Sequence, residues 1–377
     1  MTYTLIGADG EPYASATPGT LGGHRRNRGY GRLDCPAALA WIAKGHYVRH
    51  RVFFADEPTA IAAAYRPCAR CLPERYAMWK AGAWPDVAAS APVTVGFRAP
   101  LDAAGLLAFL GARAIPGVEE VDGPRYRRSV VLDHGPGVVE AVVTPSRVTV
   151  ALPLGDPRDA GAAARLVARL LDLRADAGAI DGALGADRVL GPLVARRPGL
   201  RSPGCADGGE LLVRAIVGQQ VSVAGARTVL GRLAADHGAA LDRPVGGVTR
   251  AFPTAAQLAA VDPASLPMPR ARGRAIVAAS GAVAGGDLVL EPRGDRRAAR
   301  ERLLALPGVG PWTAEYVAMR ALGDPDVFLA TDLGVRRALS CAGADAGAAG
   351  ERWRPWRSYA THHLWASEAI AIRPGSA

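Results

Sequence analysis

The sequence predicts an α+β protein of several domains, and three observations support this fold class. The chain has 377 residues, enough for two or three hydrophobic cores. Hydrophobic residues make up 49% of it and charged residues 21%, as in folded globular proteins. Three of the five cysteines lie in the first part of the chain. Short β-type runs follow, and apolar positions at helical spacing dominate the rest.

The first predicted domain covers residues 1–82 and is a small α/β module. It contains Cys35, Cys68 and Cys71, the last two in a C-x2-C spacing. An odd number of cysteines that includes such a spacing indicates metal binding rather than disulfides. Small residues over 81–86 and 88–93 then predict a short linker.

The second predicted domain covers residues 92–180 and combines an antiparallel sheet with helices. Alternating apolar positions predict its strands, and helical spacing predicts two helices. The strands are expected over 92–97, 128–133, 138–144 and 147–152, and the helices over 101–112 and 160–173.

The third predicted domain covers residues 181–370 and is all-α. Its apolar positions recur at helical spacing with few β-type runs between them. The helical segments are 209–234, 255–261, 271–284, 298–306, 312–322, 333–338 and 356–368.

Charge and composition restrict the partners. The formal net charge of +10 and the isoelectric point near 9.8 suit a polyanion. No apolar run is long enough to span a membrane, and the first residues lack the charged start of a signal peptide. We therefore expect a cytoplasmic protein that does not bind membranes.

The most informative motif is Leu306-Pro-Gly-Val-Gly310, a turn between two helical segments. Glycine tolerates the backbone conformations that such a turn requires. The amides of Gly308, Val309 and Gly310 are expected to point outward at a helix N-terminus, where the dipole favours an anion such as a DNA phosphate. The alternative is an ordinary corner between two helices.

Asp332 follows this turn at a fixed distance, before a predicted helix at Leu333. The turn and the carboxylate together resemble the helix–hairpin–helix family of DNA glycosylases. The resemblance implies that Asp332 is catalytic and stabilises oxocarbenium character on the sugar. Asp332 is also well suited to cap the helix, and the two roles are compatible. In that family the hairpin carbonyls also hold an alkali cation.

The segment Arg352-Trp-Arg-Pro-Trp-Arg-Ser-Tyr-Ala360 resembles the C-terminal signature of 3-methyladenine DNA glycosylase II, the AlkA family. The similarity extends upstream to Phe97 and covers nearly three quarters of the chain. It implies a base pocket lined by Tyr316 and Trp365, with Trp312 on the same helix face as Tyr316. Electron-rich rings would stack on cationic purines such as 3-methyladenine and 7-methylguanine in double-stranded DNA. The alternative is ordinary aromatic core packing.

A loop at Val217-Gly-Gln-Gln-Val-Ser222 matches the family's wedge, which fills the hole left by the flipped base. The inserted residue corresponds to Gln220, which is often an apolar leucine in the family. Glutamine here allows a hydrogen-bonding plug instead, and Gln219 is expected to reach the pocket or the opposite strand.

The absence of lysine defines the expected chemistry. Family members that also cut the strand carry a hairpin lysine, which forms a Schiff base with the sugar. Trp312 stands at that position, and no lysine follows Lys80. We therefore expect a monofunctional glycosylase that leaves an intact abasic site. Separately, we expect the protein to be a monomer.

At the N-terminus, Cys35-Pro-Ala and Tyr65-Arg-Pro-Cys-Ala-Arg-Cys71 resemble the Ada-type zinc domain. That family binds structural Zn²⁺ through four cysteines, one of which is also a methyl acceptor. The acceptor position falls on Gly31 here, so self-methylation is not expected. The fourth zinc ligand is then expected to be His50 or His24, with His46 a weaker candidate. Three free cysteines without a metal are the alternative.

Two other functions compete with a glycosylase for alkylated purines. One is a non-catalytic DNA-damage binding or alkylation-response regulatory protein, which would not need a carboxylate at position 332. The other is a glycosylase for oxidised or mismatched bases. The missing lysine and the absence of a C-terminal iron–sulfur cysteine cluster argue against this second reading. Residues 81–91 leave no room for the helix–turn–helix reader of the Ada-like activators.

Overall fold

The computed structural model describes residues 2–82, 91–292 and 294–371. The chain folds into two compact units, one made of Met1–Arg98 and Arg125–Ala168 and the other of Ala99–Pro124 and Arg169–Ala377. The three consecutive domains expected from the sequence remain a prediction. Within the described residues, no helix has the length and apolar character needed to cross a membrane.

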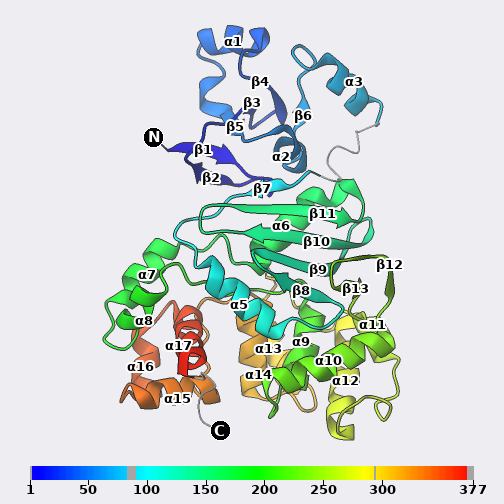
Figure 1. Cartoon of the computed structure of the whole chain (residues 1–377), viewed down its shortest axis with the longest axis vertical. Helices are drawn as coiled ribbons and strands as arrows, with labels where there is room; N and C mark the ends of the chain where they lie inside the picture. The colour runs from blue at the N-terminus through cyan, green and yellow to red at the C-terminus, as the bar shows by residue number, and fades with distance from the viewer. Residues whose placement is uncertain (1, 83–90, 293, 372–377) are drawn as a thin grey trace. The chain divides into compact units, whose positions relative to one another are not determined.

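The N-terminal part of the first unit is built on two small sheets (Figure 1). One is a two-stranded hairpin, and the other is a four-stranded sheet in the order β5-β3-β4-β6. The strands are β1 (Tyr3–Ile6), β2 (Pro12–Ser15), β3 (Leu21–His24), β4 (Gly29–Arg32), β5 (Arg51–Phe54) and β6 (Arg66–Pro67). Strand β3 pairs antiparallel with β4 and β5, whereas β4 and β6 are parallel.

Short helices surround this sheet. They are α1 (Pro36–Ala43), the 3-10 turn η1 (Val48–His50), α2 (Glu57–Ala62) and α3 (Pro73–Lys80). Tyr30, Phe54 and Tyr65 form the centre of the core. Strand β5 begins at Arg51, directly after η1. Its partner β3 ends at His24, which pairs with Arg51, so no strand is available to extend the ladder backward.

The rest of the first unit is an antiparallel run of strands in the order β7-β11-β10-β9. These are β7 (Val93–Val95), β9 (Arg125–Leu132), β10 (Gly135–Val143) and β11 (Val148–Leu154), followed by η2 (Pro157–Asp159) and α6 (Ala160–Leu170). The expected strands are therefore present within a few residues of their predicted bounds. The predicted linker lies mostly outside the described residues.

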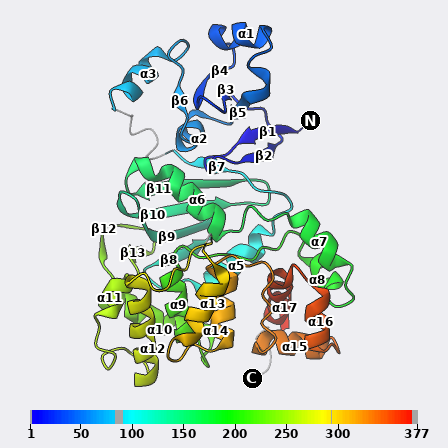
Figure 2. The same cartoon turned by 180° about the vertical axis from the view of Figure 1, so that it is seen from behind.

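The second unit is mainly helical (Figures 1 and 2). Its helices are α5 (Ala103–Arg113), α7 (Ala177–Gly185), α8 (Gly191–Arg196), α9 (Gly208–Val217), α10 (Val223–His237), α11 (Ala255–Ala259), α12 (Arg270–Ala284), α13 (Arg296–Ala305), α14 (Pro311–Arg320), α15 (Leu333–Cys341), α16 (Ala346–Arg352) and α17 (Arg357–Ala371). Its strands are β8 (Glu119–Asp122), β12 (Ala240–Val245) and β13 (Val248–Arg250). The helical segment expected over 209–234 is divided into α9 and α10, because Gln220 has a φ of 58° and Ser222 caps a new helix.

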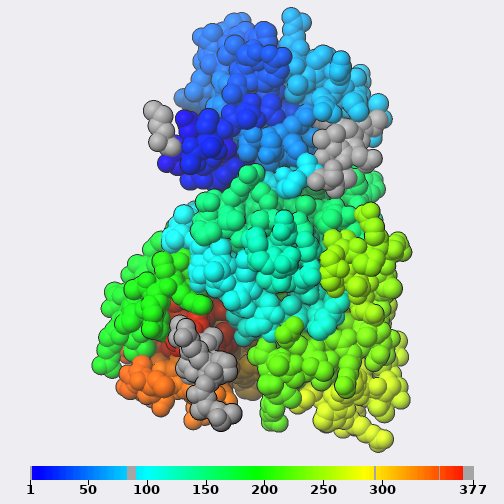
Figure 3. All heavy atoms as spheres, viewed as in Figure 1, coloured from blue at the N-terminus to red at the C-terminus, as the bar shows by residue number. Residues whose placement is uncertain are grey.

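Two apolar clusters hold the second unit together. The larger joins α9, α10, α12 and α14. The smaller joins α7 and α8 to the C-terminal helices through residues such as Ile180, Leu190, Val335 and Trp353. The green surface of α7 and α8 accordingly adjoins the orange and red surface of the C-terminal helices in Figure 3.

A partly buried polar network joins the segment around Asp172 to α17, the last helix of this unit. The Asp172 carboxylate accepts hydrogen bonds from the Tyr359 hydroxyl at 2.9 Å and the Ser202 N–H at 3.1 Å. The Arg201 guanidinium donates to the carbonyls of Asp172 and Ala175. Burial raises the pKa of Asp172 to about 6, although these hydrogen bonds and Arg201 oppose the shift.

This shift predicts a pH dependence of stability. A carboxyl with a raised pKa holds its proton more tightly when folded, so folding loses stability as the pH rises from about 3.9, the unfolded value, to about 6. Asp172→Asn cannot ionise and should escape this loss. Its stability relative to the natural chain should therefore increase across that window, by about 3 kcal/mol at most. Thermal unfolding at several pH values measures the difference, with the exposed Asp122→Asn as control. A pH-independent difference would contradict the assignment.

Candidate active site and metal centre

The glycine turn joins α13 to α14 as a tight hairpin. Gly308 has a φ of 75°, and a Cβ at this position would lie 3.0 Å from the Cβ of Ala275, so both conformation and space favour glycine. The Val309 N–H donates to the Leu306 carbonyl at 3.2 Å, which differs from the outward direction expected for it. Within the described part of the chain, the N–H groups of Gly308 and Gly310 have no protein acceptor. These two amides are the ones available to an anion.

Asp332 lies at the N-terminus of α15 and accepts four hydrogen bonds. Its Oδ1 atom accepts the backbone N–H groups of Gly334 at 2.9 Å and Val335 at 3.1 Å, so it caps the helix. The indole N–H of Trp365 reaches the same oxygen at 2.8 Å, and that of Trp312 reaches Oδ2 at 3.1 Å. The carboxylate is therefore fixed in orientation, and the helix dipole stabilises its negative charge.

Aromatic rings surround this carboxylate. Trp312 and Tyr316, four residues apart on α14, stack with centroids 5.3 Å apart and planes at 10°. Trp365 on α17 lies 6.3 Å from the Tyr316 ring and 6.5 Å from the Phe109 ring. All three predicted pocket residues are thus brought together, and each is only partly buried. Phe109 on α5 joins the group from far earlier in the chain.

Two arginines lie behind the rings. The Arg113 guanidinium is 3.8 Å from the centroid of the Phe109 ring, and burial lowers its pKa. Arg320 is buried and donates to the Tyr316 hydroxyl at 2.9 Å and to the Gly204 carbonyl at 2.8 Å. The two cations fix the positions of Phe109 and Tyr316.

His362 lies between the Phe109 and Trp365 rings and contacts both. Its ring centroid is 5.0 Å from those of both Phe109 and Trp365, and its Nε2 atom is buried without a hydrogen-bond partner. Burial, with Arg320 and Arg113 nearby, holds the pKa of His362 well below its usual range. The imidazole is therefore uncharged at neutral pH.

The predicted wedge loop contacts the hairpin. The Gln219 amide nitrogen donates to the Gly308 carbonyl and the Thr313 hydroxyl, each at 2.9 Å. Arg272 donates to the Gln219 carbonyl at 2.8 Å, which fixes the loop from α12. Gln220 is exposed and in the left-handed region. The two glutamines therefore differ, because Gln219 anchors the loop and Gln220 projects from it.

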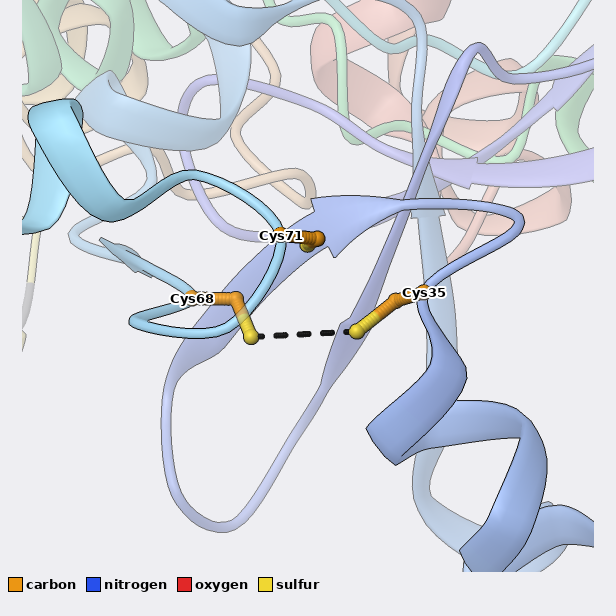
Figure 4. A group of neighbouring side chains, drawn as sticks. All are labelled: Cys35, Cys68 and Cys71. Carbon is orange, nitrogen blue, oxygen red and sulfur yellow. Dashed lines mark hydrogen bonds between the residues drawn. The ribbon is translucent and has the colours of Figure 1, made fainter.

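The three N-terminal cysteines form a second cluster, within the first unit. Their sulfur atoms lie within 4.8 Å of one another, and those of Cys35 and Cys68 are 3.9 Å apart (Figure 4). Cys35 precedes α1, whereas Cys68 and Cys71 follow β6. A tetrahedral zinc site with metal–sulfur bonds of about 2.3 Å has sulfurs about 3.8 Å apart, so the spacing fits this metal.

The two predicted histidine ligands lie outside this cluster. Among described residues, the group of potential ligand atoms contains only the three sulfurs. The His24 ring instead packs against Tyr47 at 4.7 Å and His50 at 5.3 Å, and its Nδ1 accepts the Asn27 N–H. Burial and the neighbouring sulfurs raise the pKa of Tyr47.

Sequence reasoning missed Phe109, Arg113, Arg320 and His362 as site residues. Arg320 is four residues after Tyr316 and His362 is three before Trp365, so helical spacing from the predicted pocket residues would have indicated both. Nothing local indicates Phe109 and Arg113. The other two cysteines of the chain lie outside the N-terminal cluster. Cys205 packs against the core, but Cys341 is exposed.

Comparison with known proteins identifies the chain's relatives. Residues 92–207 match the model of the AlkA N-terminal domain. DNA-3-methyladenine glycosylase 2 of Escherichia coli is 38% identical over 281 residues, which are 73% of this chain and 97% of that protein. The chain belongs to the AlkA family.

Other relatives differ in length or identity. The probable bifunctional transcriptional activator/DNA repair enzyme AlkA of Mycobacterium tuberculosis is 47% identical over 71% of this chain, and the match spans only 55% of that relative. Among solved structures, a 3-methyladenine DNA-glycosylase from Archaeoglobus fulgidus has a TM-score of 0.65 and 23% identity, over 75% of this chain and 99% of its own. The chain therefore shares the fold of this solved glycosylase.

The Gln219 anchor leads to a prediction about the wedge loop. Gln219→Ala removes two hydrogen bonds to the hairpin, each of which contributes about 1 kcal/mol. Hydrogen exchange of amides 218–222 should accelerate on the order of tenfold, because the loop opens more often. Gln220→Ala is the matched control and should change exchange little. Equal acceleration of hydrogen exchange in both variants would contradict the assignment of Gln219, and not Gln220, as the residue that anchors the loop.

Proposed function

We propose that the chain is a monofunctional DNA glycosylase that removes alkylated purines from double-stranded DNA. The observation that supports this most directly is the Asp332 carboxylate, held by two indole N–H groups whose rings belong to an aromatic cluster. A site that only caps a helix or only packs a core does not require a partly exposed carboxylate among three electron-rich rings.

Binding would begin at the hairpin. The free N–H groups of Gly308 and Gly310 lie next to the N-terminus of α14, whose dipole favours a phosphate. Gln220 projects from the adjacent loop and would occupy the space of the extruded nucleotide. Glutamine can hydrogen-bond the base left unpaired, which an apolar wedge cannot.

The extruded base would enter between Trp312, Tyr316 and Trp365. Purines alkylated at N3 or N7 carry positive charge, and cation–π attraction contributes about 1–2 kcal/mol when the site is desolvated. Alkylation also weakens the N-glycosidic bond, because the departing base leaves as a neutral species. Recognition therefore needs little beyond stacking and shape.

Hydrolysis would depend on Asp332. As the bond breaks, its electron pair leaves with the base and positive charge develops on the sugar. The fixed carboxylate stabilises this charge, and water adds at C1′ with loss of a proton. All these residues come from one chain, which supports action as a monomer.

The alkali cation of the family's hairpin is also part of the proposal. Two hairpin carbonyls already accept internal hydrogen bonds, Leu306 from Val309 and Gly308 from Gln219. A carbonyl oxygen has a second lone pair, so both remain able to coordinate a cation.

We further propose that Cys35, Cys68 and Cys71 hold structural Zn²⁺, which would cross-link the segment between β4 and α1 to the loop after β6. The sulfur spacing supports this assignment. Gly31 leaves no acceptor thiol at the position where Ada-type domains carry one, so the module is proposed not to accept methyl groups.

Asp332→Asn tests the catalytic role. The amide keeps the helix cap but loses the charge, so release of 3-methyladenine from methylated duplex DNA should fall by on the order of 10²–10³-fold. DNA affinity should change little. Asp176→Asn, at the N-cap of α7, is the matched control and should be fully active. Substantial release by Asp332→Asn would remove Asp332 from the mechanism.

The product distinguishes hydrolysis from strand cleavage. Because no lysine follows Lys80, sodium borohydride should trap no covalent protein–DNA adduct, and strands should break only after alkali or heat. Denaturing gels of a labelled duplex that contains one lesion measure both. An efficiently trapped adduct would overturn the monofunctional assignment.

The zinc proposal predicts about one zinc per chain, measured by elemental analysis, and its loss in Cys68→Ser. Chelation should loosen the first 80 residues, because so small a core depends on its metal, and should spare base release. Cys341→Ser, at an exposed cysteine, is the control. Intact mass after exposure to methylphosphotriester DNA should show unmodified cysteines, and a methyl group on any of the three would contradict the non-acceptor assignment.

A further inference from the structure

Strand β4 provides no ligand to the three-cysteine cluster, because Gly31 stands where Ada-type domains carry a fourth cysteine. A Cβ built on Gly31 would lie 2.6 Å from the Cys71 sulfur and 3.0 Å from the Cys68 Cβ. The Cys71 sulfur thus occupies the space that a side chain at position 31 would need. The Arg32 N–H also points at this sulfur, 3.4 Å away. Strand β4 contributes a backbone donor to the cluster and no ligand.

No other side chain compensates. Within the described residues, no histidine or carboxylate atom joins the three sulfurs inside 4.8 Å. The nearest acidic group along the chain, Asp34, pairs with Arg32 at 2.6 Å instead. His24 and His50 contact each other.

Zinc requires a fourth ligand. Closed structural sites are four-coordinate, and a site with three protein ligands keeps a position for an external molecule. We propose that this cluster is an open three-thiolate zinc site whose fourth position binds a thiol from solution. The proposal rests on the zinc site proposed above and extends it from a structural metal to a ligand-binding one.

The class of ligand follows from the donor set. Three thiolate ligands make the metal centre soft, and a soft metal centre favours sulfur over oxygen as its fourth donor atom. Binding would replace the S–H bond of the thiol by a metal–sulfur bond and release its proton to solvent, with no oxidation or reduction. The incoming sulfur restores the four-sulfur set that a cysteine at position 31 would complete.

Cobalt substitution tests this directly, because Co²⁺ absorption reports the ligand set. The full chain, reduced with a phosphine so that no thiol is present, is loaded with Co²⁺ and titrated with 2-mercaptoethanol. We expect about one Co²⁺ per chain and a saturable spectral change. Native mass spectrometry of the zinc form should show the added mass of one 2-mercaptoethanol. Inorganic phosphate should change neither reading.

Variants identify the position and the competing ligands. Both Gly31→Cys and Gly31→Ser require the Cys71 side chain to shift. With that shift, Gly31→Cys should show the thiol-saturated spectrum without added thiol and respond no further to thiol, whereas Gly31→Ser should not show that spectrum. His24→Ala and His50→Ala should keep the natural spectrum and its thiol response. If either histidine variant changes the cobalt spectrum, the fourth ligand comes from the chain and the proposal is wrong.

The outcomes separate this inference from the proposals on which it rests. Absence of Co²⁺ and Zn²⁺ binding would reject the metal site and the open position together. Metal binding with no response to 2-mercaptoethanol, or a response to phosphate instead, would reject the thiol site alone. Neither result bears on base release, which the Asp332→Asn comparison decides separately. If Gly31→Cys does not fold, the titration of the natural chain and the histidine variants still decide the question.

Discussion

The candidate active site depends on one carboxylate and the four N–H groups that hold it. Two of these come from the backbone of α15 and two from indole rings on α14 and α17. Asp332 therefore joins three helices, and the cluster of rings around it forms only when all three are in place. Gly334 belongs to the same arrangement, because a Cβ there would lie 3.2 Å from the Trp365 ring. A single side chain thus combines helix capping, pocket assembly and the proposed chemistry.

The parts of the site that lie close together in sequence were predictable. The hairpin, Asp332 and the pair Trp312 and Tyr316 fall on consecutive elements, so spacing and a family resemblance indicated them. Phe109 and Arg113 could not be found this way, since α5 reaches the pocket only through tertiary packing. The division of the predicted helix over 209–234 also depends on a single backbone conformation, at Gln220, which periodicity does not report.

In the N-terminal module, the cysteine cluster was predictable from the sequence, whereas the positions of His24 and His50 were not. Cysteine spacing and a family resemblance indicated the three cysteines and drew attention to Gly31, and the structure brings the cysteines together. The histidine ligand was inferred from the ligand number that zinc requires, which is chemically sound but carries no geometric information. Both histidines are engaged elsewhere, because β3 ends at His24 and η1 directs His50 toward it. Ligand count alone therefore does not identify a ligand.

The anchoring of Gln219 to the hairpin has a kinetic consequence for how damage would be found. Gln219 links the loop that carries Gln220 to the same turn whose amides are proposed to bind a phosphate. The proposed phosphate site and the proposed wedge loop are therefore joined directly by hydrogen bonds. If these roles hold, the wedge loop would meet the duplex each time the hairpin contacts the DNA backbone. The enzyme's search speed along undamaged DNA would then be limited by how quickly the phosphate contact is released.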